Sequence, residues 1–274
     1  MSTRIAFIGG GNMATSLVGG LIAAGTTPSA IIIAEPDPDK RAQLAQQYNI
    51  VTTDDNLATL QQDVVVLAVK PQLMQAVCRQ LSTAEDVRQP LFVSIAAGIR
   101  SRDIARWLGG NVAVIRCMPN TPALIRCGAT ALYAGDTVSA AQKLMADEIL
   151  SAAGITTWVV DEELLDVVTA LSGSGPAYFF LLMEAMQKTA VNMGLDADVA
   201  TKLTLQTALG AARMASESDV GPEQLRARVT SKGGTTAAAI SSFEHDDFHI
   251  HVSKALHAAC NRSRELANEL GKDQ

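Results

Sequence analysis

The chain has 274 residues, enough for two ordinary domains or one large one, and for a core that needs no disulfide staples. Hydrophobic residues make up 48% of it and charged residues 18%, a composition that argues against intrinsic disorder. The formal net charge is −6, so the chain lacks the basic footprint of a nucleic-acid-binding protein and the polybasic patch of a membrane-surface protein.

Cysteine use and hydropathy point to the cytoplasm. The cysteines form neither a CxxC pair nor a zinc-binding spacing, and we expect reduced, packed thiols at Cys78, Cys117, Cys127 and Cys260. No run approaches the roughly 18 apolar residues of a membrane span, and the most apolar stretch, residues 178–183, ends at Glu184. The first ordered element starts near Arg4, which leaves no room for a signal peptide. We therefore expect a cytoplasmic protein that does not enter a membrane.

The first half of the chain alternates between strand and helix patterns. Short apolar runs typical of buried parallel strands occupy residues 5–8, 31–35, 64–69, 91–95 and 112–115. Helical spacing falls between them, at residues 13–22, 40–48 and 101–108, and Pro71 suits the first turn of a further helix. This alternation predicts an α/β fold whose mostly parallel sheet carries helices on both faces.

The second half changes character after residues 159–160, where strand patterns fade. Helical spacing runs through residues 164–170, 177–193, 197–216 and 252–270. We place a domain boundary near Asp161 on this shift in composition. The expected organisation is an N-terminal domain of residues 1–160 and an all-helical domain of residues 161–274.

A glycine-rich turn joins the first predicted strand to the first predicted helix, in the pattern GxGxx[G/A]. Gly9 permits the tight turn, Gly11 lets the backbone approach a pyrophosphate, and Ala14 keeps helix and strand close. The free N–H groups at the helix start favour an anion. Because the motif stands between a strand and a helix, it predicts a Rossmann-type dinucleotide site, with a turn that binds no ligand as the alternative.

The choice of dinucleotide depends on the end of the second strand. Glu35 stands where an acid hydrogen-bonds the ribose 2′-hydroxyl of NADH, and the same carboxylate would repel the 2′-phosphate of NADPH. This position therefore favours NADH. In the alternative, Glu35 points to solvent before Pro36, and Arg41 neutralises a phosphate.

Later strand ends carry further candidate contacts. Lys70 follows the clearest strand, at the edge where open α/β sheets bind ligands, although a solvated lysine is the alternative. In segment 116–122, Pro119 and Pro122 force the residues before them into extended geometry, which suits the floor of a nicotinamide pocket or merely a stiff connection. Residues 96–98 are small, as a backbone near a cofactor requires, or form an ordinary turn.

Two turns that combine glycine with hydroxyl residues precede helical runs, at residues 172–176 and 230–236. In the first, Pro176 suits the first helical turn and Ser174 or Gly175 its cap. Both turns suit the docking of a small anion such as a substrate carboxylate, although two capped helix starts explain them equally well. Neither turn carries a nucleophile beside a base.

The histidines do not indicate a metal site. His245 and His249 are four residues apart, beside Asp246 and Asp247, but a zinc site needs three or four converging ligands. Hydride transfer requires no metal. We therefore expect solvated or capping histidines and no bound metal.

Five segments together resemble pyrroline-5-carboxylate reductase, over nearly the whole chain. They are FIGGGNM at 7–13, AVKPQ at 68–72, RCMPNTP at 116–122, SGSGPAY at 172–178 and VTSKGGTT at 229–236. Many dehydrogenases share the first segment. The last two are specific in their order and in their distance from the first.

The resemblance implies reduction of the cyclic imine 1-pyrroline-5-carboxylate to L-proline, the last step of proline biosynthesis, with NADH or NADPH as hydride donor. It implies cofactor contacts at Ile8, Gly9, Gly11, Asn12, Met13, Glu35, Asn56, Val69, Lys70 and Ala97. Substrate contacts are implied at Ser174, Gly233, Gly234, Thr235 and Thr236, with Thr236 as the catalytic residue near the imine nitrogen. The C-terminal helices would form a dimerisation domain that interleaves in a homodimer, and many members assemble further into decamers.

The chain departs from the family at two positions that bear on the cofactor. The position of Glu35 often carries a small or basic residue, and Arg228 stands where an asparagine that touches cofactor is often found. If Arg228 faces the cofactor, it offsets Glu35 and favours NADPH.

Two other functions are compatible with parts of the pattern. A β-hydroxyacid dehydrogenase shares a dinucleotide domain and a helical domain but needs a catalytic lysine, and neither Lys188 nor Lys202 stands in a glycine-rich turn. A non-catalytic dinucleotide-sensing module would keep the turn at 9–14 and have no reason for the turns at 172–176 and 231–236.

Overall fold

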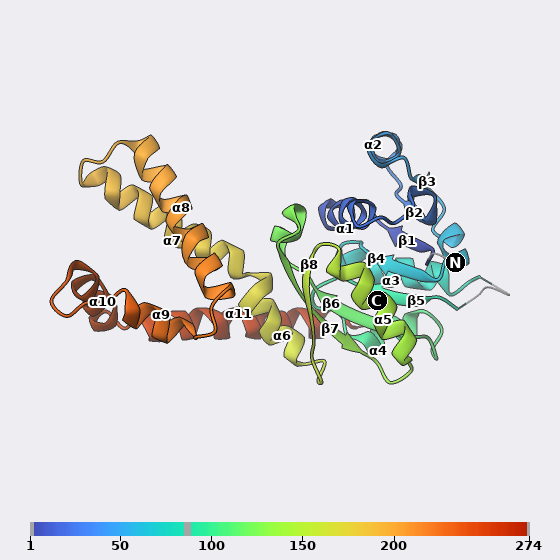
Figure 1. Cartoon of the computed structure of the whole chain (residues 1–274). Coiled ribbons are helices and arrows are strands. Elements are labelled where there is room, and N and C mark those ends of the chain that lie inside the picture. Colours follow the sequence, from blue (N-terminus) through green and yellow to red (C-terminus); the bar gives the residue numbers. More distant parts are fainter. Residues whose placement is uncertain (1–2, 85–88, 273–274) are drawn as a thin grey trace. The chain divides into compact units, whose positions relative to one another are not determined.

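The computed structural model describes residues 3–84 and 89–272 (Figure 1). The first half of the chain forms an eight-stranded sheet. The strands are β1 (Ile5–Ile8), β2 (Ile31–Ala34), β3 (Val51–Thr53), β4 (Val64–Leu67), β5 (Leu91–Ser94), β6 (Val114–Met118), β7 (Gly128–Ala134) and β8 (Gly154–Trp158).

Helices alternate with the strands in the first half of the chain, and the described residues after β8 form helices and their connections. In the first half they are α1 (Asn12–Ala23), α2 (Pro38–Tyr48), α3 (Pro71–Leu81), α4 (Ser101–Trp107) and α5 (Ala140–Ser151), with short 3₁₀ segments at Pro28–Ala30, Leu57–Gln61 and Thr121–Ile125. The second half holds α6 (Leu164–Val168), a π-helical segment (Thr169–Gly173), α7 (Gly175–Asn192), α8 (Ala197–Ser216), α9 (Pro222–Arg228), α10 (Thr235–His245) and α11 (Phe248–Leu270).

The strand order is β3-β2-β1-β4-β5-β6-β7-β8, and the first six strands run parallel. Only the pairing of β6 with β7 is antiparallel within this sheet. Ile8 of β1 stands in register with Ala34 of β2 and Leu67 of β4. The carboxyl ends of these three strands therefore meet at one edge, and the predicted mostly parallel α/β fold is confirmed.

Side chains of each central strand alternate between two cores, as the period of a strand requires. In β1, Ile5 and Phe7 pack into the core beneath α1, α2 and α5, whereas Ala6 and Ile8 pack into the core beneath α3 and α4. All four are at most 2% exposed. Burial on both faces explains why these strands are continuous apolar runs in the sequence.

The chain divides into two compact units, of which the second comprises Gly175–His257. The first runs to Ser174 and resumes at Ala258, so this division falls later than the boundary expected near Asp161. The carboxylate of Asp166 in α6 accepts hydrogen bonds from Arg100 and from Ser263 of α11, each at 2.6 Å. These contacts build α6 and the end of α11 into the first unit.

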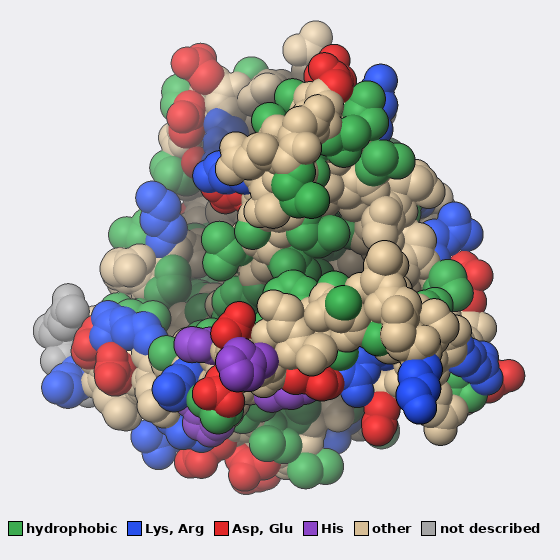
Figure 2. Space-filling model, turned by 90° about the vertical axis from the view of Figure 1, so that its left-hand side faces the viewer, with side chains coloured by type: hydrophobic (Ala, Val, Ile, Leu, Met, Phe, Trp, Pro, Cys, Tyr) green, Lys and Arg blue, Asp and Glu red, His purple; other side chains and the backbone are tan. Residues whose placement is uncertain are grey.

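The second unit leaves large apolar side chains open (Figure 2). On α7, Phe179, Phe180 and Leu181 are each more than 60% exposed. A cavity of about 770 Å³ lies among α7, α9, α10 and α11, and its lining includes Met186 and Phe243. Contiguous apolar surface of this kind marks an interaction face.

The cysteines provide a test of the packing. Burial raises the pKa of the Cys78 and Cys117 thiols to about 12, because desolvation disfavours the thiolate. Cys127 is exposed. We expect iodoacetamide at neutral pH to alkylate Cys127 in the folded protein and to spare Cys78 and Cys117 until denaturant is added, as measured by peptide mass spectrometry. Rapid alkylation of Cys78 or Cys117 in the folded protein would contradict the core described above.

Candidate active site

The glycine-rich turn brings the start of α1 to the carboxyl edge of the sheet. Gly9 has φ +96°, and a Cβ atom there would lie 2.7 Å from the carbonyl oxygen of Ala68, so the turn requires glycine. A Cβ atom at Gly11 would meet nothing within 4 Å. Gly11 is the N-cap of α1 and supplies no side-chain cap, whereas Asp37 caps α2. Uncapped N–H groups beside open space suit an anion.

A cavity of about 340 Å³ lies at this turn. Among the expected cofactor contacts, its lining includes Ile8, Gly9, Gly11, Glu35, Asn56, Val69 and Lys70. These residues come from the ends of β1, β2 and β4 and from the segment after β3, so the parallel sheet gathers them at one edge. The open cradle at Gly11 and the uncapped start of α1 fit a dinucleotide pyrophosphate.

Three expected cofactor residues stand outside the lining of this cavity. The carbonyl of Asn12 accepts a hydrogen bond from the Ser16 hydroxyl at 2.8 Å, and Met13 packs against the core beneath α1. Ala97 packs against the small cluster that contains Met118. Their roles toward a cofactor stay predictions.

Glu35 is buried, with 8% of its surface exposed, so it does not point to solvent. Its Oε2 accepts a hydrogen bond from the Gly10 N–H at 2.8 Å, and its Oε1 accepts one from the Asp37 N–H at 3.2 Å. The carboxylate therefore braces the glycine-rich turn while it lines the cavity. Arg41 donates from Nη1 to the carbonyl oxygens of Glu35 and Pro36, at 2.7 and 2.9 Å.

Segment 116–122 is connected to the start of the second half through Asn120. Its Oδ1 accepts a hydrogen bond from the Ala129 N–H at 2.9 Å, and its Nδ2 donates to the Ser172 carbonyl at 3.0 Å. Pro176, four residues after Ser172, has no N–H to offer that carbonyl. The Asn120 amide supplies the missing donor and fixes the segment 116–122.

The helix expected to start at Ser174 or Gly175 does start there: α7 begins at Gly175, and Pro176 stands in its first turn. A π-helical segment, Thr169–Gly173, precedes α7, and the Ser174 N–H donates to the Thr169 carbonyl at 2.8 Å. Pro176 itself has no N–H to offer an anion. The docking of a small anion at this turn stays a prediction.

The second glycine turn also begins a helix. Gly233 has φ +73°, Gly234 is the N-cap of α10 without a side-chain cap, and Thr235 and Thr236 follow as its first residues. The Gly234 N–H donates to the Ser231 carbonyl at 3.0 Å, whereas the N–H groups of Thr235 and Thr236, at the helix start, have no carbonyl partner within the helix and suit an anion. This turn belongs to the second unit, whereas Ser174 belongs to the first.

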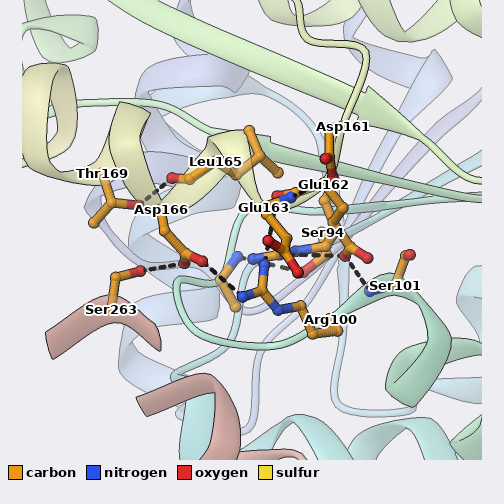
Figure 3. A network of polar contacts seen from close by, with 12 residues as sticks. Ser94, Arg100, Ser101, Asp161, Glu162, Glu163, Leu165, Asp166, Thr169 and Ser263 are labelled. Atoms are coloured by element: carbon orange, nitrogen blue, oxygen red, sulfur yellow. Dashed lines mark hydrogen bonds and ion pairs between the residues drawn. The ribbon is translucent and has the colours of Figure 1, made fainter. Parts of the chain in front are cut away.

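A buried polar network that the sequence reading missed surrounds the loop after β5 (Figure 3). Arg116 on β6 donates from Nη1 to Glu162 at 2.8 Å, and the same Glu162 oxygen accepts the Ser101 N–H at 2.6 Å. Burial lowers the pKa of Arg116, and the Glu162 carboxylate opposes this shift. The sequence offered one signal of this network, namely Arg116 within the apolar pattern of a strand.

The network holds the loop that carries Ala97. Arg100, at the N-cap of α4, pairs with Asp166 at 2.6 Å. Gly98 in the same loop has φ +70°, and a Cβ atom there would lie 3.1 Å from the Cβ of Leu266 on α11. The loop between β5 and α4 is thus fixed by α6 and by the end of α11.

The histidines lie on or beside α10 and α11. The ring of His257 contacts the Ser253 carbonyl at 2.8 Å through Nδ1. Within residues 3–84 and 89–272, no group of three or more His, Cys, Asp or Glu side chains is placed to hold a metal ion. The expectation that the protein binds no metal stays a prediction.

The glycine-rich turn, the acid at the end of β2 and the cavity at the edge of a parallel sheet define a dinucleotide-binding oxidoreductase. Residues 4–98 match the family model described as NADP oxidoreductase, coenzyme F420-dependent. Residues 162–266 match the model described as pyrroline-5-carboxylate reductase dimerisation. The chain belongs to the pyrroline-5-carboxylate reductase family.

Relatives of this family match over nearly their whole length. The pyrroline-5-carboxylate reductase of Pseudomonas aeruginosa is 54% identical over 274 residues, covering 99% of this chain and 100% of the relative. A reductase structure from Coxiella burnetii superposes with a TM-score of 0.93 at 45% identity, covering 97% of this chain and 99% of that one. The Plasmodium falciparum pyrroline carboxylate reductase, solved with NADP bound, gives 0.85 at 27% identity, covering 97% and 98%.

These matches do not favour a β-hydroxyacid dehydrogenase or a sensing module. One helical stretch, Leu164–Asn192, is long and apolar enough, by length and composition alone, to cross a membrane. The most apolar uninterrupted stretch, residues 178–183, is too short to predict this. The stretch lies within the residues matched to dimerisation, which supports self-association.

The ion pair between Arg116 and Glu162 can be tested for its contribution to the stability of the fold. Glu162→Ala leaves the buried guanidinium without its carboxylate, and we expect the free energy of unfolding to fall by about 3 kcal/mol. Urea unfolding at fixed protein concentration measures this change. Glu163→Ala, which removes the exposed neighbouring carboxylate, is the matched control and should cost less than about 0.5 kcal/mol. Equal losses in the two variants would show that the pair does not stabilise the fold.

Proposed function

We propose that the chain reduces 1-pyrroline-5-carboxylate to L-proline with NADH or NADPH. The observation that carries the proposal is the 54% identity, over the full length, with the pyrroline-5-carboxylate reductase of Pseudomonas aeruginosa. The cavity at the glycine-rich turn, which suits a dinucleotide, supports the proposal. The reaction adds a hydride to the imine carbon, converts the iminium nitrogen to an amine and leaves the oxidised dinucleotide.

The first unit holds the cofactor. When bound, the reduced nicotinamide supplies the hydride. Gly9 and Gly11 leave the backbone N–H groups at the start of α1 to the pyrophosphate. The remaining contacts are Ile8, Asn12, Met13, Glu35, Asn56, Val69, Lys70 and Ala97. Glu35 binds the ribose 2′-hydroxyl and favours NADH.

The turn before α10 holds the substrate. Gly233 and Gly234 leave the N–H groups of Thr235 and Thr236 to the substrate carboxylate, and Ser174 adds a hydroxyl contact. The Thr236 hydroxyl oxygen accepts a hydrogen bond from the iminium N–H and so orients the C=N bond for attack. Because the substrate binds as the iminium, the reaction needs no strong acid or base from the protein.

The proposal extends to assembly and location. A homodimer covers the apolar surface of α7 around Phe179 to Leu181, since a permanent interface resembles a divided core. Dimers assemble further into a decamer, and the protein works in the cytoplasm without a membrane or a metal. Residues 1–160 serve the cofactor, and residues 161–274 serve the substrate and the dimer.

Thr236→Ala tests the catalytic assignment. Loss of the hydroxyl removes the contact to the ring nitrogen, and we expect kcat to fall by about 100-fold. The dissociation constants of NADH and NADPH should stay unchanged, and Thr236→Ser should keep most of the activity. Steady-state kinetics and cofactor titration measure these quantities. Unchanged turnover in Thr236→Ala would sink the assignment.

Glu35→Ser tests the cofactor contact. Removal of the carboxylate removes the repulsion of a 2′-phosphate, so the ratio of kcat/KM for NADPH to that for NADH should rise by about ten-fold. The variant also loses the brace on Gly10, and both absolute values are expected to fall. For that reason the ratio is the quantity to compare. A ratio equal to that of the unaltered protein would mean that Glu35 does not touch the ribose.

A further inference from the structure

We infer that Lys40 binds the 2′-phosphate of NADPH, so that the Glu35–Lys40 pair lets one site accept both dinucleotides. The inference rests on the proposed function, because it assigns a specificity-determining residue to the same cofactor site. Glu35 receives the ribose hydroxyl of NADH, and Lys40 receives the extra phosphate of NADPH.

The position of Lys40 is that of a cofactor contact. Its Nζ lies 3.4 Å from Oε2 of Glu35, and both residues line the cavity at the glycine-rich turn. In sheets of this type the adenosine ribose lies at the end of β2, where an acid binds the 2′-hydroxyl and a nearby cation accommodates a 2′-phosphate. The Lys40 side chain is 39% exposed, so its ammonium group can turn toward a ligand.

Lys40 is not needed to satisfy Glu35. The Glu35 carboxylate already accepts hydrogen bonds from the N–H groups of Gly10 and Asp37. An ammonium group has three donors, and the Glu35 contact uses one of them. Lys40 also stands in the first turn of α2, where the helix dipole disfavours a positive charge. The fold therefore gains little from a lysine at this position.

Of two other cations near the cavity, Arg41 is held by backbone carbonyls and by Asp54, and Lys70 follows a different strand. Arg41 donates to the carbonyl oxygens of Glu35 and Pro36, and its Nη2 lies 3.6 Å from Asp54. Lys70 lines the same cavity but follows β4, which pairs with β1 on the side opposite to β2. Lys40 is thus the cation at the ribose end of the site.

The charges around this point explain why a cation matters. Glu35 and Asp54 both line the cavity, and either carboxylate would repel a phosphate dianion. Arg41 lies beside Asp54, whose side chain is 73% exposed and screened by water. Glu35 is buried, so its repulsion of a phosphate is screened less, and a cation beside it that reaches the phosphate offsets that repulsion.

Lys40→Met tests the inference by cofactor binding without substrate. Titration of nicotinamide fluorescence should show the dissociation constant of NADPH rising by about ten-fold. The constant for NADH should stay within about two-fold of the unaltered protein. Lys143→Met, which alters an exposed lysine of α5 outside the cavity, is the matched control and should change neither constant. Equal changes for both dinucleotides, or no change for NADPH, would overturn the assignment.

A second variant separates direct contact from neutralisation of Glu35. In the Glu35→Gln background, Lys40→Met should still weaken NADPH by about ten-fold, because the lysine acts on the phosphate itself. If the loss vanishes in that background, Lys40 acts only through Glu35 and the inference is wrong. The titration contains no pyrroline-5-carboxylate. It therefore tests the role of Lys40 in NADPH binding even if the protein does not reduce that substrate.

Discussion

The backbones at the ends of β1 and β4 approach so closely that position 9 has room for no side chain. A Cβ atom on Gly9 would press on the Ala68 carbonyl at 2.7 Å, in a backbone conformation that other residues rarely adopt. This contact sets the tight turn, and the turn places the uncapped start of α1 beside open space at the edge of the sheet. Everything proposed for the cofactor follows from that placement, including the brace that Glu35 supplies from β2 to Gly10.

The helical half of the chain depends on a different kind of constraint. Asp166 of α6 accepts hydrogen bonds from Arg100 and Ser263, and Asn120 binds the carbonyl that Pro176 leaves free. These buried polar contacts fix the loops at the sheet edge to the segments that lead into and out of the helical unit. That unit leaves its apolar side chains exposed, which accords with the match of residues 162–266 to a dimerisation domain. The loops at the sheet edge are therefore fixed by residues that lie within the segment matched to dimerisation.

Much of the fold was predictable because the central strands are buried on both faces and appear as continuous apolar runs. The run expected at 112–115 lies at Val114–Met118, since Arg116 interrupts the apolar pattern while remaining in the strand. β7, with the sequence GATALYA, was missed because small residues give no strand pattern. The hydrogen bond from Asn120 to the Ser172 carbonyl was also not predictable, because the two residues lie 52 positions apart in the sequence. The glycine turn and Glu35 were found from the sequence, but Lys40 was not, because its contact depends on the path of the chain around Pro36.

The most direct test of the account is the oxidation of NADH and NADPH by the purified protein in the presence of pyrroline-5-carboxylate, followed by nicotinamide absorbance. We expect turnover with both dinucleotides and proline as the product. Binding of either dinucleotide without turnover would contradict it, because a site that holds cofactor and reduces no imine is a sensor or acts on another substrate.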